Sequence, residues 1–492
     1  MRSVKFMVVA VLSIVALAAC DNEEKASLTL NKTALYFSSW EDSAQVVSYV
    51  EQDAEYVAVG SITEGWDATV DPVARRIIVM PVGTTEEGKS NDDLAKEGYM
   101  VVNALSRDNL ATSCYVYLYI CETESLDTEG RANCYVVTKP ITNYTFDVMH
   151  RPDGEPLATK SVKLLWQSNK DVVKNVDFVD GRAMFYIESS ANDATLLTDT
   201  NAVIGACNDA GEVIWSWHLW IVNENPLAEV DTYANGKTFM RKNLGAFINA
   251  NGSPEEQKIL DSYGLYYQWG RKDPFIRPYY YDAAGAESET LYYENDGYIT
   301  ENFVARTADS GTLDYSIKNP LQYIYNAESS EYKGDSGAGV GDWLVAADNA
   351  LWSDTDKSLY DPCPYGWRVP TAEDLSVLDL SYAEDNTKLE VARKQFGWHL
   401  SDGNNNYFYS ACGRRRYTDG KVENINYKDG AYPSQPQPWE GHYWTSTTAA
   451  DGGAVSLYFD LTTERTKTIN KFVKNKSRFR ANGMQVRCVK VV

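Results

Sequence analysis

The fold of this chain is decided by one stretch, Asp361-Pro362-Cys363-Pro364-Tyr365-Gly366-Trp367-Arg368-Val369-Pro370-Thr371. Its prolines and Gly366 predict a tight turn, and the aromatic residues that follow predict a rigid step. Thr371 is suited to cap a helix over Ala372 to Leu380, with Asp374 as its capping-box partner three residues later. The stretch therefore predicts a turn, an aromatic step and a helix start in direct succession.

Further motifs lie around this stretch in a fixed order. They are Gly264-Leu265-Tyr266-Tyr267-Gln268-Trp269-Gly270-Arg271-Lys272-Asp273-Pro274-Phe275, Tyr443-Trp444-Thr445-Ser446-Thr447, Leu457-Tyr458-Phe459-Asp460 and Val486-Arg487-Cys488-Val489. The ordered set resembles the Fibrobacter succinogenes major paralogous domain, a C-type-lectin-like module of bacterial surface proteins. The resemblance covers roughly residues 228–492 and implies an α+β lectin-like domain. It also implies a Cys363–Cys488 disulfide, because in such folds the termini lie together and a late Cys often bridges to an internal one.

Helix-forming patterns occur within this region. Ser253-Pro254-Glu255-Glu256 combines an N-cap, a proline at the first helical position and a capping-box glutamate, and Gly264 is placed to end that helix. A further helix is expected from Thr387 to Phe396, ended by Gly397.

The N-terminus resembles a lipoprotein signal peptide. Arg2 and Lys5 precede an apolar run from Phe6 to Leu17, which is too short to cross a membrane. Leu17-Ala18-Ala19-Cys20 resembles a lipobox, so Cys20 is expected to be lipidated. An ordinary secretory signal with an incidental cysteine is the alternative.

The residues after Cys20 bear on where in the cell the protein is located. The acidic run Asp21-Asn22-Glu23-Glu24 resembles the surface-export signal of Bacteroidetes lipoproteins, and a flexible solvated tether is a second interpretation. We expect a protein of the outer membrane that faces the cell exterior and is held there by its lipid anchor alone.

Composition limits the possible partners. The chain has 492 residues, which predicts about two to four domains. Its formal net charge of −23 repels nucleic acid and anionic lipid and argues against both as partners. Aromatic residues make up 12% of the chain, which favours β-sandwich cores and stacking surfaces.

Residues 27–124 predict a β-sandwich, because short apolar or β-branched runs alternate with turn-forming residues. The opening Leu28-Thr29-Leu30-Asn31, the central Trp66 and the closing Tyr115-Val116-Tyr117-Leu118 resemble the BACON domain (Bacteroidetes-associated carbohydrate-often N-terminal). Despite their name, such domains also serve as spacers.

A second β unit is expected over residues 133–224. It closes with the run from Val213 to Val222, which is apolar on nearly both faces and predicts a central, buried strand. His218 lies within this run and is expected to be a core histidine and not a catalytic one.

The predicted fold class is therefore a multi-domain protein with two Ig-like β-sandwiches and a final α+β C-type-lectin-like domain. Its parts are a lipoprotein signal peptide (1–20), an acidic tether (21–26), a BACON-like sandwich (27–124), a linker (125–132), a second sandwich (133–224) and the major paralogous domain (228–492).

Catalytic motifs are absent from the sequence. The four histidines form no His-Glu-x-x-His zinc motif, and no Gly-x-Ser-x-Gly elbow occurs. A glycosidase pair of carboxylates is uninformative here, because 69 acidic residues always offer some pair. We expect no catalytic residues and no enzyme activity.

The predicted ligand site is the proline-rich loop that ends at His442. Sugars bind by stacking on aromatic faces and by hydrogen bonds from planar polar side chains. The candidate residues are Gln435, Gln437, Trp439, Glu440 and His442. In the alternative interpretation, Trp439 packs back onto the core and only steadies the loop.

The chain departs from the calcium-binding motifs of sugar-binding C-type lectins at two places. Those lectins carry Asp or Asn where this chain has Gln437, and their Trp-Asn-Asp motif is replaced by Tyr443-Trp444-Thr445-Ser446. Both departures argue against a Ca²⁺-dependent sugar site of that type. No metal ligands and no cofactor are expected, and Ca²⁺ is the one ion left open.

Non-catalytic recognition or adhesion at the cell surface is the function these features predict, with a glycan or a cell-surface protein as the partner. Two alternatives come from other classes. One is a structural role as a tip or accessory subunit of a fimbria, and the other is a glycan-active enzyme, which the missing motifs disfavour.

Replacing Cys20 with Ser is expected to release the protein from membranes, because the acyl chains would supply the whole membrane affinity. Fractionation of cells that express Cys20→Ser should find the protein in soluble fractions. A variant that still sediments with membranes would show that the lipobox interpretation is wrong.

Overall fold

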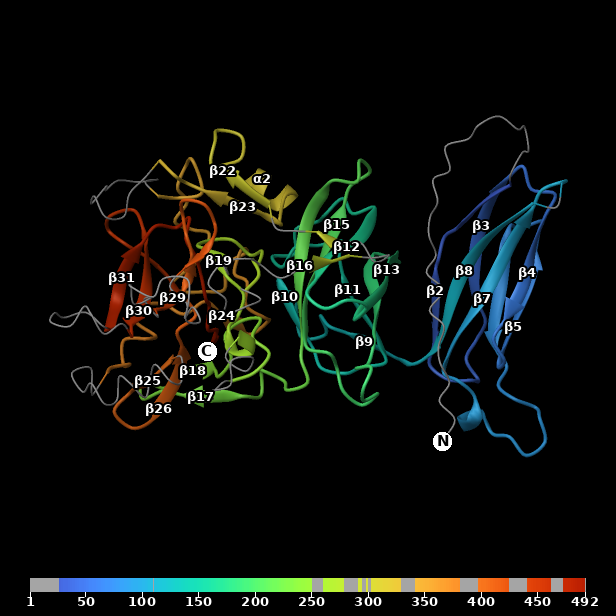
Figure 1. The fold of residues 1–492 in the computed structure, drawn as a ribbon, viewed down its shortest axis with the longest axis horizontal. Coiled ribbons are helices and arrows are strands. Elements are labelled where there is room, and N and C mark those ends of the chain that lie inside the picture. Colours follow the sequence, from blue (N-terminus) through green and yellow to red (C-terminus); the bar gives the residue numbers. More distant parts are fainter. Residues whose placement is uncertain are drawn as a thin grey trace, which may run out of the picture. The chain divides into compact units, whose positions relative to one another are not determined.

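The structure is a computed structural model that describes residues 26–108, 110–249, 260–277, 291–293, 298–299, 302–328, 341–380, 397–423, 440–461 and 472–491. The chain divides into two compact units, Met1–Cys121 and Glu122–Val492. Strands dominate both units (Figure 1). Within the described residues, α-helix is limited to α2 (Leu313–Lys318) and residues 260–262, and a single 3-10 turn, η1 (Asn91–Asp93), lies in the first unit.

The first unit is a β-sandwich of two four-stranded sheets, as the sequence predicts (Figure 1). One sheet has the strand order β1 (Ser27–Leu30), β3 (Gln45–Gln52), β6 (Arg76–Pro81) and β5 (Trp66–Asp71). The other has the order β2 (Ala34–Phe37), β8 (Ala111–Ile120), β7 (Glu97–Leu105) and β4 (Tyr56–Ile62).

Side chains that alternate between the two faces of each strand build this sandwich. Along β7, Met100 and Val102 are fully buried while their sequence neighbours point outward, and Trp66 joins the same core. The apolar run from Leu28 to Phe37 is split between β1 and β2, which lie in different sheets, with β2 parallel to β8.

A second sandwich opens the second unit. One sheet has the order β13 (Val173–Val179), β14 (Arg182–Ile187), β11 (Thr142–Asp147) and β9 (Glu122–Ser125). The other has the order β10 (Cys134–Val137), β16 (Val213–Ile221), β15 (Thr200–Cys207), β12 (Ser161–Gln167), β20 (Leu291–Tyr292) and β21 (Tyr298–Ile299). Because β20 and β21 follow residue 228 in the sequence, the C-terminal region adds strands to the second sandwich.

Strand β16 is buried on both faces. The side chains of Trp215, Trp217 and Leu219 belong to the core between the two sheets of the second sandwich. Trp220 belongs to a different core, which is shared with the C-terminal region. The prediction of a central, buried strand here is correct, and the second covering layer is the C-terminal region itself.

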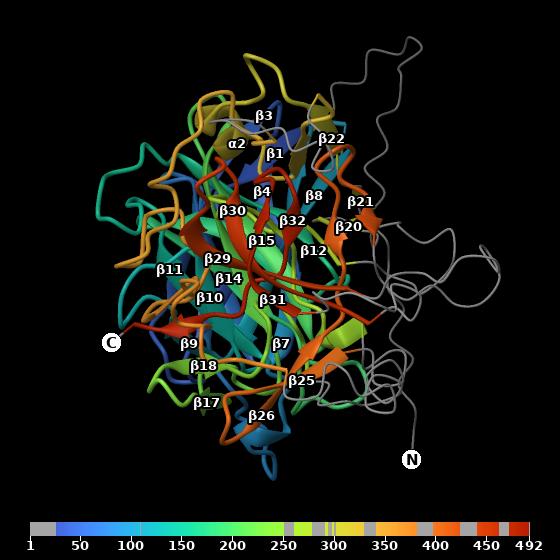
Figure 2. The same cartoon turned by 90° about the vertical axis from the view of Figure 1, so that its left-hand side faces the viewer.

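The C-terminal region is assembled from small sheets. One four-stranded sheet has the order β17 (Val230–Thr232), β18 (Thr238–Met240), β33 (Val489–Lys490) and β24 (Trp367–Arg368). A second four-stranded sheet has the order β19 (Tyr267–Gln268), β32 (Gly483–Met484), β27 (Arg414–Arg415) and β28 (Val422–Glu423). The others are the pairs β22 (Asn302–Ala305) with β23 (Gln322–Tyr325) and β25 (Gly397–Ser401) with β26 (Asn406–Ser410), and a three-stranded sheet of β29 (Glu440–Thr448), β30 (Ala454–Asp460) and β31 (Phe472–Arg478). Figure 2 shows β29, β30 and β31 side by side.

The start and the end of this region meet in one sheet. Near the end of the chain, β33 pairs with β18 through Phe239 and Val489, and with β24 through Arg368 and Val489. The motif around Trp367 thereby lies at the edge of this sheet, beside the last strand of the region.

The helix predicted from Ala372 to Leu380 is not formed, and this prediction was wrong. The capping box itself is present, because Thr371 N–H donates to Asp374 Oδ2 at 2.8 Å and Asp374 N–H donates to Thr371 Oγ1 at 3.0 Å. The chain continues in turns because Asp379 exchanges two backbone hydrogen bonds with Ser401, which require an extended conformation. The helices predicted at 253–264 and 387–396 lie outside the described residues, apart from the segment 260–264.

A buried histidine in β16 predicts sensitivity to acid. His218 is 2% exposed, its Nε2 lies 2.9 Å from Asn201 Oδ1, and its Nδ1 has no hydrogen-bond partner among the described residues. Desolvation lowers the pKa of His218 to about 3. The unfolded chain binds a proton below its ordinary pKa of about 6.5, so stability is lost as the pH falls from there toward the folded pKa.

Below about pH 6.5, the free energy of unfolding of the parent chain should decrease as the pH falls. We expect His218→Gln to make this decrease smaller, by up to about 1.4 kcal/mol for each pH unit. Urea unfolding followed by tryptophan fluorescence at several pH values measures this slope. A slope in His218→Gln equal to that of the parent chain would contradict the assignment.

Candidate binding site

The predicted ligand loop is only partly covered by the structure. Gln435, Gln437 and Trp439 lie outside the described residues. Glu440 and His442 are described, and they are 5% and 0% exposed in β29. Their assignment to an exposed loop was wrong, because β29 begins at Glu440 and pairs with β30 from that residue onward.

Glu440 and His442 form a buried polar network. His442 Nε2 lies 2.8 Å from Glu440 Oε2, and the Tyr458 hydroxyl donates to Glu440 Oε1 at 2.9 Å. Desolvation lowers the pKa of His442 to about 4, although Glu440 opposes the shift. Desolvation raises the pKa of Glu440, but His442 and the charge of Arg414 outweigh it and lower this pKa to about 2. The pair is thus a structural element of the sheet.

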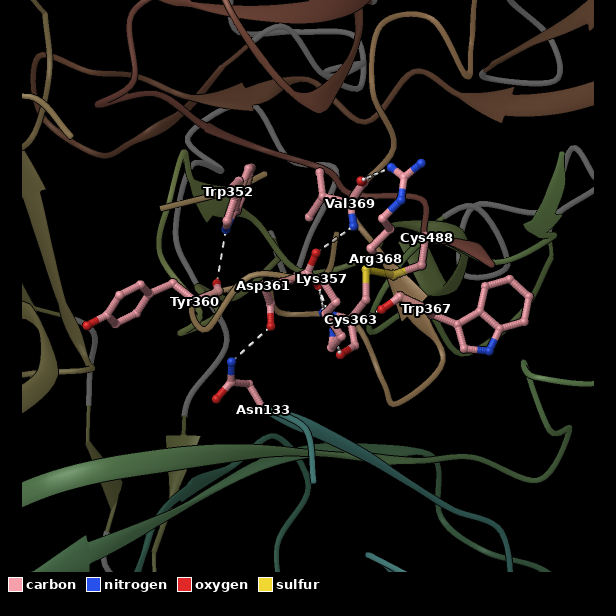
Figure 3. The surroundings of a disulfide bond; sticks show 10 residues. All are labelled: Asn133, Trp352, Lys357, Tyr360, Asp361, Cys363, Trp367, Arg368, Val369 and Cys488. Carbon is pink, nitrogen blue, oxygen red and sulfur yellow. Dashed lines mark hydrogen bonds and ion pairs between the residues drawn. A yellow bond between two sulfur atoms is a disulfide. The ribbon is translucent and has the colours of Figure 1, made fainter. Parts of the chain in front are cut away.

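The Cys363–Cys488 disulfide proposed from the sequence is present in the structure, and it closes a loop of 125 residues (Figure 3). Asp361 organises the turn beside this disulfide. Its Oδ1 accepts hydrogen bonds from the backbone N–H of Cys363 and from Lys357 Nζ, both at 2.8 Å, and its Oδ2 accepts one from Val369 N–H at 2.8 Å.

The second sandwich is tied to the same turn by one side chain. Asn133 Nδ2 donates to the backbone carbonyl of Asp361 at 2.9 Å (Figure 3). It also donates to the backbone carbonyl of Leu359 at 2.7 Å. Asn133 Oδ1 accepts a hydrogen bond from Trp215 Nε1 at 3.1 Å. A single amide therefore connects β16 to the stretch that decides the fold.

A buried ion pair forms a second connection. Lys272 Nζ lies 2.7 Å from Asp273 Oδ1 and 2.9 Å from the Ser216 carbonyl. The Ser216 hydroxyl donates to Asp273 Oδ1 at 2.5 Å, and Lys272 Nζ lies 4.7 Å from the centroid of the Trp215 ring. The Gly264–Phe275 motif thus supplies polar groups that fasten the C-terminal region to β16.

A cavity of about 390 Å³ lies where these two parts of the second unit meet. Its apolar lining comes from the turn after β11, from the start of β16 and from α2, through Leu157, Val213, Ile214, Trp215 and Ile317. This volume is at the lower end of the range of small-ligand sites, which extends from about 300 to 1,000 Å³.

Charged side chains of both signs surround the opening. Lys318 Nζ pairs with Asp314 Oδ2 at 3.0 Å on α2, and Arg151 pairs with Asp153 at 2.9 Å while its guanidinium lies 5.9 Å from the Trp215 ring centroid. Glu155 completes the charged lining. An apolar floor with hydrogen-bonding groups at its edge suits a small amphipathic ligand such as a sugar.

Helix α2 is positioned for this role by its own capping. The Thr312 side chain accepts a hydrogen bond from Tyr315 N–H at 3.2 Å, and Asp314 and Lys318 occupy the first and last turns. Ile317 packs against the core of the second sandwich. Sequence reasoning missed this site, because its three segments carry no motif and are far apart in the chain.

Within the described residues, no group of three or more His, Cys, Asp or Glu residues is arranged to hold a metal ion. Within the same residues, no helix is long and apolar enough to cross a membrane.

No protein-family model and no curated protein matches the chain. Among solved structures, one match is SGBP-B of the Bacteroides ovatus mixed-linkage glucan utilization locus, in complex with a mixed-linkage heptasaccharide. It is 8% identical, the match covers 41% of this chain and 48% of that chain, and the TM-score is 0.13. The D00-D0 domain of intimin matches at 8% identity over 39% of this chain and 96% of that chain, with a TM-score of 0.14. The human desmocollin-1 ectodomain matches at 9% identity over 44% and 46%, with a TM-score of 0.15. Similarity this low carries no argument about fold, ligand or partner.

The Asp361 carboxylate gives a prediction for stability. Asp361→Ala removes three hydrogen bonds and leaves the Lys357 ammonium without its carboxylate partner, so we expect a loss of about 3 kcal/mol in the free energy of unfolding. Urea unfolding measures it, with Asp356→Ala, a change at an exposed carboxylate of the same segment, as the control. Equal unfolding midpoints for the two variants would show that Asp361 does not organise the turn.

Proposed function

We propose that this protein is a non-catalytic recognition protein of the cell surface that binds a glycan in the cavity between the second sandwich and α2. The cavity carries the proposal, because it combines an apolar floor, a buried indole and charged groups at its edge. Recognition of a cell-surface protein is the other form of the same function, and binding experiments separate the two.

A non-catalytic role is supported by the chemistry of the cavity lining. The lining contains no Ser, Thr, Cys, His or Tyr side chain that would act as a nucleophile or a base. Its carboxylates, Glu155 and Asp314, are exposed. A glycosidase acid needs a carboxyl that its surroundings keep protonated near neutral pH, and burial is the usual means.

The proposal includes the place of the protein in the cell. Lipidation at Cys20 would anchor the chain to the outer membrane, and the acidic residues that follow would direct it to the exterior or act as a tether. The support is the order of a basic start, a short apolar run and a cysteine after small residues.

The proposal also includes the lectin-like identity of residues 228–492 and the BACON-like identity of the first sandwich. The lectin-like assignment is supported by the meeting of β18 and β24 on β33, and by the Cys363–Cys488 bond beside that sheet. Both are expected of a domain whose two ends lie together.

Filling the cavity should abolish binding. Leu157→Trp places an indole in the space lined by Ile214 and Ile317, so we expect at least a tenfold loss of affinity for the glycan that the full chain selects on a glycan array, with a melting temperature within a few degrees of the parent.

Leu196→Trp is the matched control, because Leu196 is an exposed residue of the same sandwich outside the cavity lining. It should bind like the parent chain. Full binding by Leu157→Trp would remove the cavity from the proposal. Product formation from the selected glycan would replace non-catalytic recognition with an enzyme.

A further inference from the structure

We propose that the outward face of the sheet β2–β8–β7–β4 in the first sandwich is a binding platform for a neutral glycan. Three tyrosines on this face are about half exposed: Tyr99 at 46%, Tyr115 at 41% and Tyr117 at 43%. They come from β7 and β8, the two central strands of the sheet (Figure 1). This platform, named the tyrosine face below, belongs to the first unit and does not depend on the cavity of the second unit.

Strand register brings the rings together. Tyr99 is directly opposite Tyr117, and the Tyr99 and Tyr115 ring centroids are 5.9 Å apart. The row continues toward β2, where Tyr36 stacks on Tyr119 with centroids 5.3 Å apart and planes inclined by 14°. Tyr119 is only 6% exposed, so it supports Tyr36 and offers no stacking face of its own. The exposed rings of Tyr99, Tyr115 and Tyr117 cover adjacent positions on two strands, which is an arrangement suited to stack against sugar rings.

The general preference of strands for tyrosine does not explain this row. The opposite sheet of the same sandwich has four strands with the same need for β-forming residues. Its aromatic residues, Tyr49 and Trp66, are buried in the core, and its exposed large apolar side chains are Val46, Val50 and Met80. Exposed aromatics are thus concentrated on one of two equivalent sheets.

Charge selects the class of glycan. The strands β2, β4, β7 and β8 contain no Lys or Arg, and Glu97 is their one charged residue. An anionic glycan needs cations for charge-assisted hydrogen bonds, and this face offers none within its strands. The acidic chain as a whole, with a net charge of −23, repels polyanions as well. A neutral glycan satisfies both conditions.

A fixed amide lies at one end of the row. Asn103 follows Val101 on the same face, and its Oδ1 accepts a hydrogen bond from the Ser113 hydroxyl at 2.7 Å. On β4, a Cβ atom at Gly60 would lie 2.3 Å from Asn103 Nδ2, so the amide occupies space that a side chain at this position would need. A planar polar group held next to aromatic rings is suited to hydrogen-bond sugar hydroxyls.

Affinity electrophoresis of the full chain tests the proposal. The gels contain a soluble β-glucan, xylan, galactomannan or starch as neutral probes, and polygalacturonate as the anionic probe. We expect at least one neutral polysaccharide to retard the chain and polygalacturonate not to. Tyr117→Ala and Tyr115→Ala should each weaken the retarding interaction on the order of tenfold.

Val50→Ala and Met80→Ala are the matched controls, because they remove exposed apolar groups from the opposite sheet. They should migrate like the parent, and all four variants should melt within a few degrees of it, since exposed substitutions change stability little. Leu157→Trp, which fills the cavity of the second unit, should leave this retardation unchanged, so failure of one site is distinguishable from failure of the other.

Three results would overturn the proposal. They are retardation by polygalacturonate alone or by no polysaccharide, equal retardation of the tyrosine variants and the parent, and a self-associating parent chain that Tyr117→Ala converts to monomers in analytical ultracentrifugation. The last result would assign the tyrosine face to contact with a second copy of the chain.

Discussion

Burial of β16 on both faces is the constraint on which the second unit depends. One face supplies Trp215, Trp217 and Leu219 to the sandwich core, so it needs the other sheet. The opposite face carries Ser216, His218 and Trp220, all of which need partners when they are removed from water. Ser216 bonds Asp273, His218 bonds Asn201, and Trp220 Nε1 donates to the Ala246 carbonyl at 2.9 Å. Asn201 lies in β15 of the same sandwich, whereas Asp273 and Ala246 belong to the C-terminal region. The sandwich therefore leaves Ser216 and Trp220 without these partners unless the C-terminal region covers them.

The covering of β16 by the C-terminal region determines where the cavity lies. The covering region brings α2 against the start of β16, and the cavity forms where the two meet. In the described part of the first sandwich, Tyr99, Tyr115 and Tyr117 stay exposed on the outward face of their sheet, so these side chains are accessible to solvent or to a ligand. The cavity thus forms beside a sheet face that another region covers, whereas the tyrosine face is a sheet face that stays exposed.

Local patterns were predictable from the sequence, and long-range ones were not. The two-faced apolar run from Val213 to Val222 was enough to predict a buried strand. The capping box at Thr371 was also correct, but the turn it opens gives no helix because Asp379 pairs with Ser401, a contact that no local pattern encodes. Glu440 and His442 satisfy each other inside a sheet, whereas the prolines that precede them favoured a loop. The cavity joins three segments without a motif, and the Cys363–Cys488 pair was proposed through a family resemblance and not through spacing.

Native-state hydrogen exchange of the full chain tests most directly whether the second sandwich and the C-terminal region form one cooperative unit. The measurement compares backbone amides of β16 that are bonded to β10 or β15 with the amide of Met240, which is bonded to the Cys488 carbonyl. One cooperative unit predicts the same opening free energy and the same denaturant dependence for both groups. Opening of β16 at a much lower free energy, while Met240 stays protected, would show that the sandwich unfolds without its neighbour and would contradict the account.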